Sequence, residues 1–197
     1  MIAEEDLGRL HEAALFLLRE LGCIVSDVEA LALLRANGAT VDGELVRLHE
    51  PLVAKALATV PAEYTVAGRR PELDLRVAPD APPVLSGAFG PAFVLDAGEQ
   101  RPSTLSDLRA AIALGHVSPN ISVHGLYVEA LDVPAHRRTR MGAHAYVTGS
   151  DKPCMVPAAS LAELQVATDV LEILHGAEWH ARPRLLSNIN STSPLQL

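Results

Sequence analysis

Short apolar segments alternate with helical patterns in the second half of this chain, and this alternation constrains the fold more than any other feature. Residues 121–128, 153–156 and 184–190 read as strands, whereas residues 136–148 and 160–174 read as helices. Strands and helices that alternate through short loops predict right-handed parallel βαβ units. Such a series closes into a barrel of about eight units or spreads into an open sheet.

The last stretch of the chain, residues 184–197, begins as a strand and continues into a loop rich in Ser and Asn. No helical pattern follows to cover that strand. About three strands are far fewer than the eight units of a closed barrel. We therefore expect the fold to be incomplete within this chain, and we expect the chain alone to lack a complete pocket.

The first half of the chain has two different patterns. Residues 4–21 carry apolar side chains at helical spacing, and two further helices are expected, the last over residues 52–60 with Pro51 in its first turn. From Pro61 onward the pattern alternates with period two, which predicts short strands separated by Pro and Gly turns. The strand candidates are residues 64–66, 73–77, 84–86 and 93–96. The predicted fold class is α/β, with a helical cap over residues 1–60, a β-rich insert over 61–103 and βα units over 104–197.

Several helix starts are marked by side chains that can accept a hydrogen bond from the first helical turn. Ser26, Thr104 and Ser160 each have an acidic residue three positions later, the pattern of a capping box or a close relative of it. Asp132 is expected to cap the helix that begins near Pro134.

Composition limits the functional classes. The 197 residues carry a net charge of −8, so we expect no nucleic-acid partner, because no basic face is available to neutralise phosphate. The basic run at residues 136–140 is interpreted as a solvated helix face. No apolar run approaches the roughly 18 residues of a membrane span, and the acidic N-terminus is unlike a signal peptide. Cys23 and Cys154 are far apart and have no CxxC partner, which indicates reduced thiols in a cytoplasmic protein.

The sequence lacks familiar catalytic and metal-binding motifs. The eight histidines are scattered and form no HxH or HExxH pair, which predicts no metal site. The motifs GxGxxG, GxxxxGK[ST] and GxSxG are also missing. Conventional hydrolase, kinase and dinucleotide-binding functions therefore have no support, and the catalytic residues are unknown.

Ligands of parallel α/β folds bind at the carboxyl ends of the strands. The predicted strands end at residues 124–129, 156–158 and 188–193, and the last of these is the most polar. A hydrogen-bonded turn of Asn and Ser and a ligand-contacting loop are equally good interpretations of it. His124 and Tyr127 are expected on opposite faces of one strand, and a core histidine with satisfied hydrogen bonds is the favoured role.

Two aromatic residues, Phe89 and Phe93, flank a Gly-Pro turn in a chain with only 4% aromatic residues. Aromatic rings near a cleft can hold a quaternary ammonium group by cation–π attraction. On residue type alone, two hydrophobic anchors of a hairpin are the favoured interpretation.

The order of several short motifs resembles the trimethylamine methyltransferase family over nearly the whole chain. In the first half these motifs are residues 21–26, 36–42, 47–53 and 60–61. The segment 96–107 with Arg101, Thr104 and Asp107 resembles the passage from hairpin to barrel in that family. The pairs Asn120-Ile121 and Lys152-Pro153 and the run 193–195 continue in the same order.

This resemblance implies a TIM-barrel enzyme that demethylates a methylamine or a quaternary amine such as trimethylamine or glycine betaine. The methyl group would pass to the cob(I)alamin of a partner corrinoid protein, so no cofactor is expected to bind this chain directly. The matching part is the N-terminal cap and the first part of the barrel, so we expect this chain alone to be inactive. The residues expected to contribute to substrate binding are Phe89, Tyr127, Asn188 and Asn190.

A second hypothesis is a non-catalytic remnant or partner subunit that associates through its open barrel edge, because exposed strand edges favour pairing. Both hypotheses predict a homo-oligomer. The sequence does not indicate which methylated amine would be bound.

Overall fold

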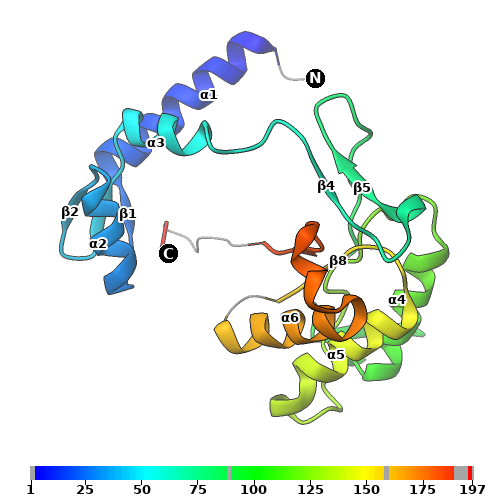
Figure 1. Cartoon of the computed structure of the whole chain (residues 1–197). Helices are drawn as coiled ribbons and strands as arrows, with labels where there is room; N and C mark the ends of the chain where they lie inside the picture. Colours follow the sequence, from blue (N-terminus) through cyan, green and yellow to red (C-terminus); the bar gives the residue numbers. More distant parts are fainter. Residues whose placement is uncertain (1–2, 88–89, 158–159, 189–194, 197) are drawn as a thin grey trace. The chain divides into compact units, whose positions relative to one another are not determined.

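The computed structural model describes residues 3–87, 90–157, 160–188 and 195–196 (Figure 1). Contacts divide the chain into two compact units, one of residues up to Pro61 together with Leu195 and Gln196, and one that begins at Ala62 and includes the chain through Asn188. The three-part division into residues 1–60, 61–103 and 104–197 stays a prediction.

The first unit is built from helices around a small sheet. The helix α1 (Glu4–Phe16) continues into a π-helical turn at Leu17–Leu21. Next come β1 (Cys23–Ile24), α2 (Val28–Ala36), β2 (Thr40–Asp42), β3 (Leu45–Arg47) and α3 (Glu50–Leu57). The strands form an antiparallel sheet of order β1-β3-β2, and Leu195 accepts the Ile24 N–H at 2.9 Å. Its core is Cys23, Val25, Ala39 and Val46.

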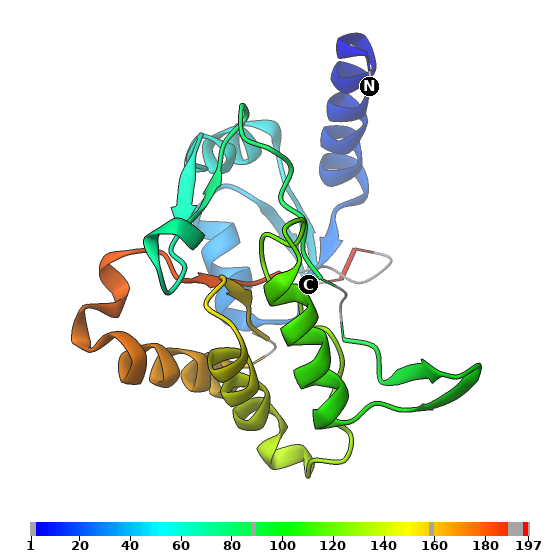
Figure 2. The ribbon, with the colours of Figure 1, turned by 90° about the vertical axis from the view of Figure 1, so that its right-hand side faces the viewer.

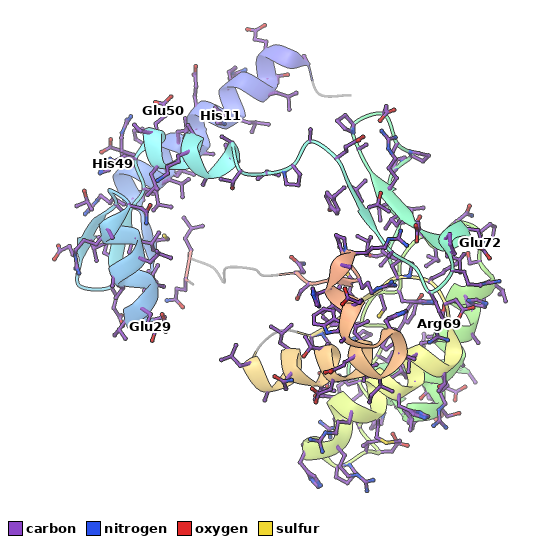
Figure 3. The ribbon with its side chains drawn as sticks, in the orientation of Figure 1. His11, Glu29, His49, Glu50, Arg69 and Glu72 are labelled. Carbon is purple, nitrogen blue, oxygen red and sulfur yellow. The ribbon has the colours of Figure 1, made fainter. Side chains whose placement is uncertain are left out.

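Short sequence patterns mark the starts of these helices. The N-cap of α2 is Asp27, whose carboxylate accepts the Ala30 N–H at 2.7 Å. The predicted cap Ser26 is therefore wrong by one residue. Pro51 lies in the first turn of α3, as expected, and at the start of this helix His49 is hydrogen-bonded to Thr40 at 2.9 Å (Figure 3).

Two antiparallel hairpins begin the second unit. In the first, β4 (Tyr64–Val66) pairs with β5 (Leu75–Val77), and a 3-10 turn at Pro71–Leu73 lies between them. In the second, β6 (Phe93–Asp96) pairs with β7 (Glu99–Pro102) through a turn at Ala97 and Gly98, both of which have positive φ. Figure 2 shows this second hairpin projecting away from the helices of its unit.

The rest of the unit alternates helices with short strands, as the sequence predicts. The elements are α4 (Leu105–Val117), α5 (Ala135–Gly149), β8 (Cys154–Met155), α6 (Leu161–His175), a 3-10 turn (Ala177–Ala181) and β9 (Leu185–Leu186). The strand β8 pairs with β9 in parallel, and His124 forms a parallel bridge with Cys154. The predicted parallel direction of these segments is confirmed.

A fourth parallel segment comes from the region predicted as a β-rich insert. Ser86 forms a parallel bridge with Val123, and the Leu85 carbonyl accepts the N–H of Ser122 at 2.9 Å. The helix α4 connects this segment to the next one along the chain. The parallel order is therefore 86, 123–124, 154–155 and 185–186.

The fold class is mixed α/β, with six α-helices and several small sheets among the described residues. The strands do not close into a barrel within this part of the chain. Each parallel segment has only one or two paired residues among those described. An incomplete TIM barrel thus stays a prediction.

Two of the predicted caps in this unit are confirmed and one is wrong. Thr104 and Asp107 form a complete capping box on α4, and Ser160 accepts the Glu163 N–H at 3.3 Å on α6. Asp132 does not cap α5. Its carboxylate instead accepts the Leu105 N–H at 2.7 Å and so supports α4, which packs beside α5.

Candidate functional site

The carboxyl ends of the parallel segments are held together by backbone contacts. The N–H of Gly90 donates to the carbonyl of Leu126, and the Glu129 N–H donates to the Pro91 carbonyl at 3.2 Å. The buried hydroxyl of Ser103 donates to the Glu129 carbonyl at 2.6 Å. The loop after the first segment therefore runs beside the loop after the second, which fixes the position of Glu129.

A cavity of about 420 Å³ lies between α5, α6 and the strand ends. Its lining is mostly apolar and includes Leu126, Val128, Val156, Val166 and Val170. The charged residues of the lining are Glu129, Arg138 and Glu163. A volume of this size is within the range of ligand pockets, and apolar walls with few charges are typical of them.

Glu129 is the charged residue directly after the segment at 123–124. Its carboxylate lies 4.0 Å from the Arg138 guanidinium, and its side chain is 54% exposed. The Arg138 Nε donates to the Val133 carbonyl at 2.9 Å, which orients the guanidinium. A carboxylate in this position can interact with a cation that approaches the strand ends.

Cys154 contributes a thiol to the cavity wall. Burial raises the pKa of this thiol to about 11, so it is a neutral thiol at neutral pH. The thiolate is the reactive form of cysteine, so Cys154 contributes a protonated, weakly nucleophilic thiol to the cavity wall.

His124 is completely buried, and both of its ring nitrogens have partners. Its Nδ1 lies 2.9 Å from the Tyr127 hydroxyl, and its Nε2 lies 2.6 Å from the Ser150 hydroxyl. Burial, together with electrostatic repulsion from Lys152 and His116, lowers the pKa of His124 to about 4. The expectation of a core histidine with satisfied hydrogen bonds is confirmed.

Ser150 determines the direction of the hydrogen bonds in this buried network. Its hydroxyl accepts the Lys152 N–H at 3.1 Å and lies 2.9 Å from His116 Nδ1. A hydroxyl has one proton and two lone pairs. It therefore donates to one histidine and accepts from the other, and a neutral His124 satisfies either arrangement.

Tyr127 and Tyr146 fix the loop that follows this histidine. The Tyr146 hydroxyl donates to the Gly125 carbonyl at 2.6 Å and accepts the Tyr127 N–H at 3.1 Å. The two rings are stacked with centroids 6.4 Å apart. Burial raises the pKa of both hydroxyls, so both are protonated at neutral pH.

Lys152 ties the end of α4 to the start of the strand layer. Its ammonium donates to the carbonyls of Gly115, Ser118 and Ile121 at 2.8, 2.7 and 2.8 Å. Burial lowers the pKa of Lys152. Because each of its three ammonium protons has a carbonyl acceptor, this lysine has a structural role.

A second ionic contact supports the amino ends of the strands. Arg69 pairs with Asp151 at 2.9 Å, and its guanidinium also donates to the Val147 carbonyl at the end of α5 (Figure 3). The N–H of Ala67 donates to the Pro183 carbonyl at 2.7 Å. The 67–69 loop therefore packs against the end opposite to the cavity-forming strand ends.

Two of the four predicted substrate residues, Tyr127 and Asn188, lie in the described part of the chain. Tyr127 is buried against α4 and α5, and its bond to His124 contradicts the expectation that the two side chains lie on opposite faces. Asn188 is exposed after β9. Phe89 and Asn190 lie outside the described residues, so the roles of all four in substrate binding stay predictions.

Sequence reasoning missed several residues of these networks. Ser150, Lys152 and Tyr146 have no short-range pattern, because their partners lie on other elements. Glu129 had one available signal, since it is the acidic residue at the carboxyl end of a predicted strand.

The described residues contain neither a metal-binding cluster nor a membrane-spanning helix. No group of three or more His, Cys, Asp or Glu side chains in this part of the chain is placed to hold a metal ion. None of the described helices combines the length and the apolar composition needed to cross a membrane.

Comparison with known proteins gives matches over the full length. The model of the family described as trimethylamine methyltransferase (MTTB) matches residues 1–197. A glycine betaine methyltransferase of Desulfitobacterium hafniense (strain Y51) is 28% identical over 200 residues, which cover 100% of this chain and 42% of the relative. The chain thus spans less than half the length of this relative.

Two further relatives, both from Eubacterium limosum, match parts of the chain. A proline betaine:corrinoid methyltransferase is 31% identical over 108 residues, which cover 54% of this chain and 22% of the relative. An L-carnitine:corrinoid methyltransferase is 34% identical over 94 residues, which cover 48% of this chain and 19% of the relative. Because the family model matches every residue from 1 to 197, the chain belongs to the trimethylamine methyltransferase family.

Proposed function

We propose that this chain is the N-terminal part of a methyltransferase that moves a methyl group from a methylated amine to the cobalt of a corrinoid protein. The observation that carries the proposal is the family match over residues 1–197. The names of three relatives add support, since glycine betaine, proline betaine and L-carnitine all contain a quaternary ammonium group.

The reaction is a displacement at the methyl carbon. The corrinoid of the partner protein would supply the nucleophile that bonds to the methyl carbon, and the electrons of the broken carbon–nitrogen bond would stay on nitrogen. A quaternary ammonium thus becomes a neutral tertiary amine, and no further oxidant or reductant is needed. The contribution of the polypeptide is to orient the methyl group and to exclude water.

In this proposal the parallel segments are the first strands of a TIM barrel, with the substrate at their carboxyl ends. Glu129 and Asn188 follow two of these segments, and the Glu129 carboxylate would attract the positively charged ammonium. Tyr127 would form part of the buried layer next to the site, because its side chain is buried and hydrogen-bonded to His124. Phe89 and Asn190 are proposed as further contacts to the substrate.

Methyl transfer to free cob(I)alamin tests the proposal. The 197-residue chain is incubated with cob(I)alamin and either trimethylamine or glycine betaine, and the absorbance of methylcobalamin is followed. We expect no product, because a barrel of about eight units needs more strands than this chain contains. The same assay on a polypeptide extended through the downstream reading frame should give product with one of the two amines.

The incomplete pocket and the methyltransferase function are contradicted by different results. Turnover by the 197-residue chain would contradict the incomplete pocket. Absence of turnover with an extended, folded polypeptide and every methylated amine tested would contradict the methyltransferase function.

The second candidate function is a non-catalytic subunit that associates through a strand edge. It is favoured by β9, which pairs with β8 on one side and with no other strand among the described residues. Lack of turnover by the extended polypeptide, combined with stable association of the chain, would favour this alternative.

A further inference from the structure

The outer face of α5 carries a row of basic side chains. His136, Arg137, Arg140 and His144 are all exposed. Their spacing places them on one side of the helix, and Arg138 and Gly142, which line the cavity, lie on the opposite side. We call these four residues the α5 basic face.

The two arginines of this face have no carboxylate partner among the described residues. Within the described part of the chain, no salt bridge joins Arg137 or Arg140 to a carboxylate. Arg138 differs from them, because it turns to the cavity and lies 4.0 Å from Glu129. The helix itself contains three arginines and neither Asp nor Glu.

The position of these arginines is unfavourable within the isolated helix. Arg137 and Arg140 lie in the first two turns of α5, where the helix dipole presents partial positive charge. Intramolecular electrostatics therefore do not stabilise the cluster. In a chain of net charge −8, a local positive face of this kind is suited to attract a negatively charged partner.

The face also lies close to the end of the unit where a partner would have to act. The helix α5 begins after the segment at 123–124, so its first turns lie toward the carboxyl ends of the parallel strands. In the proposed function, the substrate methyl group is bound at this end, and the cobalt must approach it from there.

We propose that the α5 basic face binds an acidic surface of the corrinoid protein. The identity of the partner rests on the proposed function, whereas the acidic character of the partner follows from the exposed charges. Nucleic acid and anionic membranes are poorer candidates, because the α5 basic face consists of only four residues, whereas binding of a phosphate-rich surface normally uses a wider basic patch.

Binding of labelled poly-L-glutamate to the 197-residue chain tests the acidic preference without any need for catalysis. The charge-reversal variant Arg137→Glu/Arg140→Glu should bind about tenfold more weakly at about 50 mM salt. The matched control Arg9→Glu/Arg19→Glu changes the net charge equally at exposed positions of α1 and of the π-helical turn that follows it, and its loss should be at most about threefold. Circular dichroism confirms that both variants are folded.

Three results of this experiment would overturn the proposal. They are no binding of the unmodified chain at low salt, equal loss in both variants, and tighter binding of heparin or phosphatidylserine vesicles than of poly-L-glutamate.

Steady-state kinetics of the extended, active polypeptide test the partner itself. With a corrinoid protein as methyl acceptor, Arg137→Glu/Arg140→Glu should raise KM for that protein about tenfold relative to Arg9→Glu/Arg19→Glu. An equal loss of rate with free cob(I)alamin would contradict docking. Absence of methyl transfer by every form would instead contradict the proposed function, and the poly-L-glutamate result would be unaffected.

Discussion

At the scale of single residues, the protonation of His124 couples stability to pH. Its ring is fully buried, and both nitrogens contact hydroxyl groups. The pKa of this histidine is lowered to about 4 in the folded protein, against about 6.5 in an unfolded chain. Between these two values the unfolded chain binds a proton that the folded protein does not, so stability rises with pH.

The pH dependence of unfolding tests this protonation state. As the pH falls from about 6.5 to about 4, the free energy of unfolding should fall by at most about 1.4 kcal/mol per pH unit. The comparison is with His124→Gln, measured by urea denaturation across the same range. The difference between the two proteins isolates His124 from His175, whose pKa is also lowered by burial. Identical slopes would show that His124 does not titrate in this window.

Two helical glycines differ in what an added methyl group would meet. A Cβ at Gly115 would lie 2.0 Å from the Tyr127 hydroxyl and 3.0 Å from the His124 ring. At Gly142 nothing lies within 4 Å. Gly115→Ala should therefore destabilise the fold by about 1–3 kcal/mol, because the tyrosine must move. Gly142→Ala should stabilise it by up to about 1 kcal/mol through helix propensity.

Urea denaturation of both variants measures the change in the free energy of unfolding, which should have opposite signs in the two. A stabilising effect of Gly115→Ala would mean that the Tyr127 ring is not packed against α4.

At the scale of elements, Arg101 joins the β6–β7 hairpin to the start of α4. It contacts Asp107 through two nitrogens at 2.8 and 2.9 Å, and Asp96 at 2.9 Å. The same aspartate accepts the Thr104 N–H in the capping box at 2.8 Å. The guanidinium and these hydrogen bonds keep the pKa of Asp107 well below its usual range.

Arg101→Lys should weaken the connection between the β6–β7 hairpin and α4, because an ammonium group cannot reproduce the two parallel hydrogen bonds to Asp107. We expect Tm to fall by about 2–4 °C and amide hydrogen exchange to quicken across residues 99–107. The matched control is Arg76→Lys, at an arginine that pairs with Glu63 and Asp80 in the other hairpin. Equal effects of the two substitutions would argue against a special role of the Arg101 contacts.

The elements also show what local sequence can and cannot predict. The helices follow from apolar spacing, and the Thr104 cap follows from a three-residue pattern. Asp132 is a residue type that often caps helices and it precedes α5. Its carboxylate nevertheless accepts a hydrogen bond from the first turn of α4, which lies beside it in space. No local pattern predicts the bridge between Ser86 and Val123, because α4 lies between these two residues in the sequence.

At the scale of the whole molecule, the parallel direction of the later segments could be predicted from alternation, whereas the site could not. The network of His124, Ser150 and His116 joins a strand, a loop and a helix, and none of the three residues has a motif. The family resemblance, by contrast, depends on the order of many short motifs and was confirmed over residues 1–197.

Association of the purified chain is the prediction that belongs to this scale. The strand β9 pairs with β8 on one edge, and its other edge has no strand beside it in the described residues. An open edge presents unpaired N–H and C=O groups that can pair with another chain. Light scattering should therefore show a mass that rises with protein concentration. Ser187→Lys, which places a charge directly after β9, should suppress the increase, whereas Ser106→Lys on the exposed surface of α4 should not. A monomer over the whole concentration range would contradict pairing through this edge, and so would equal effects of the two lysines.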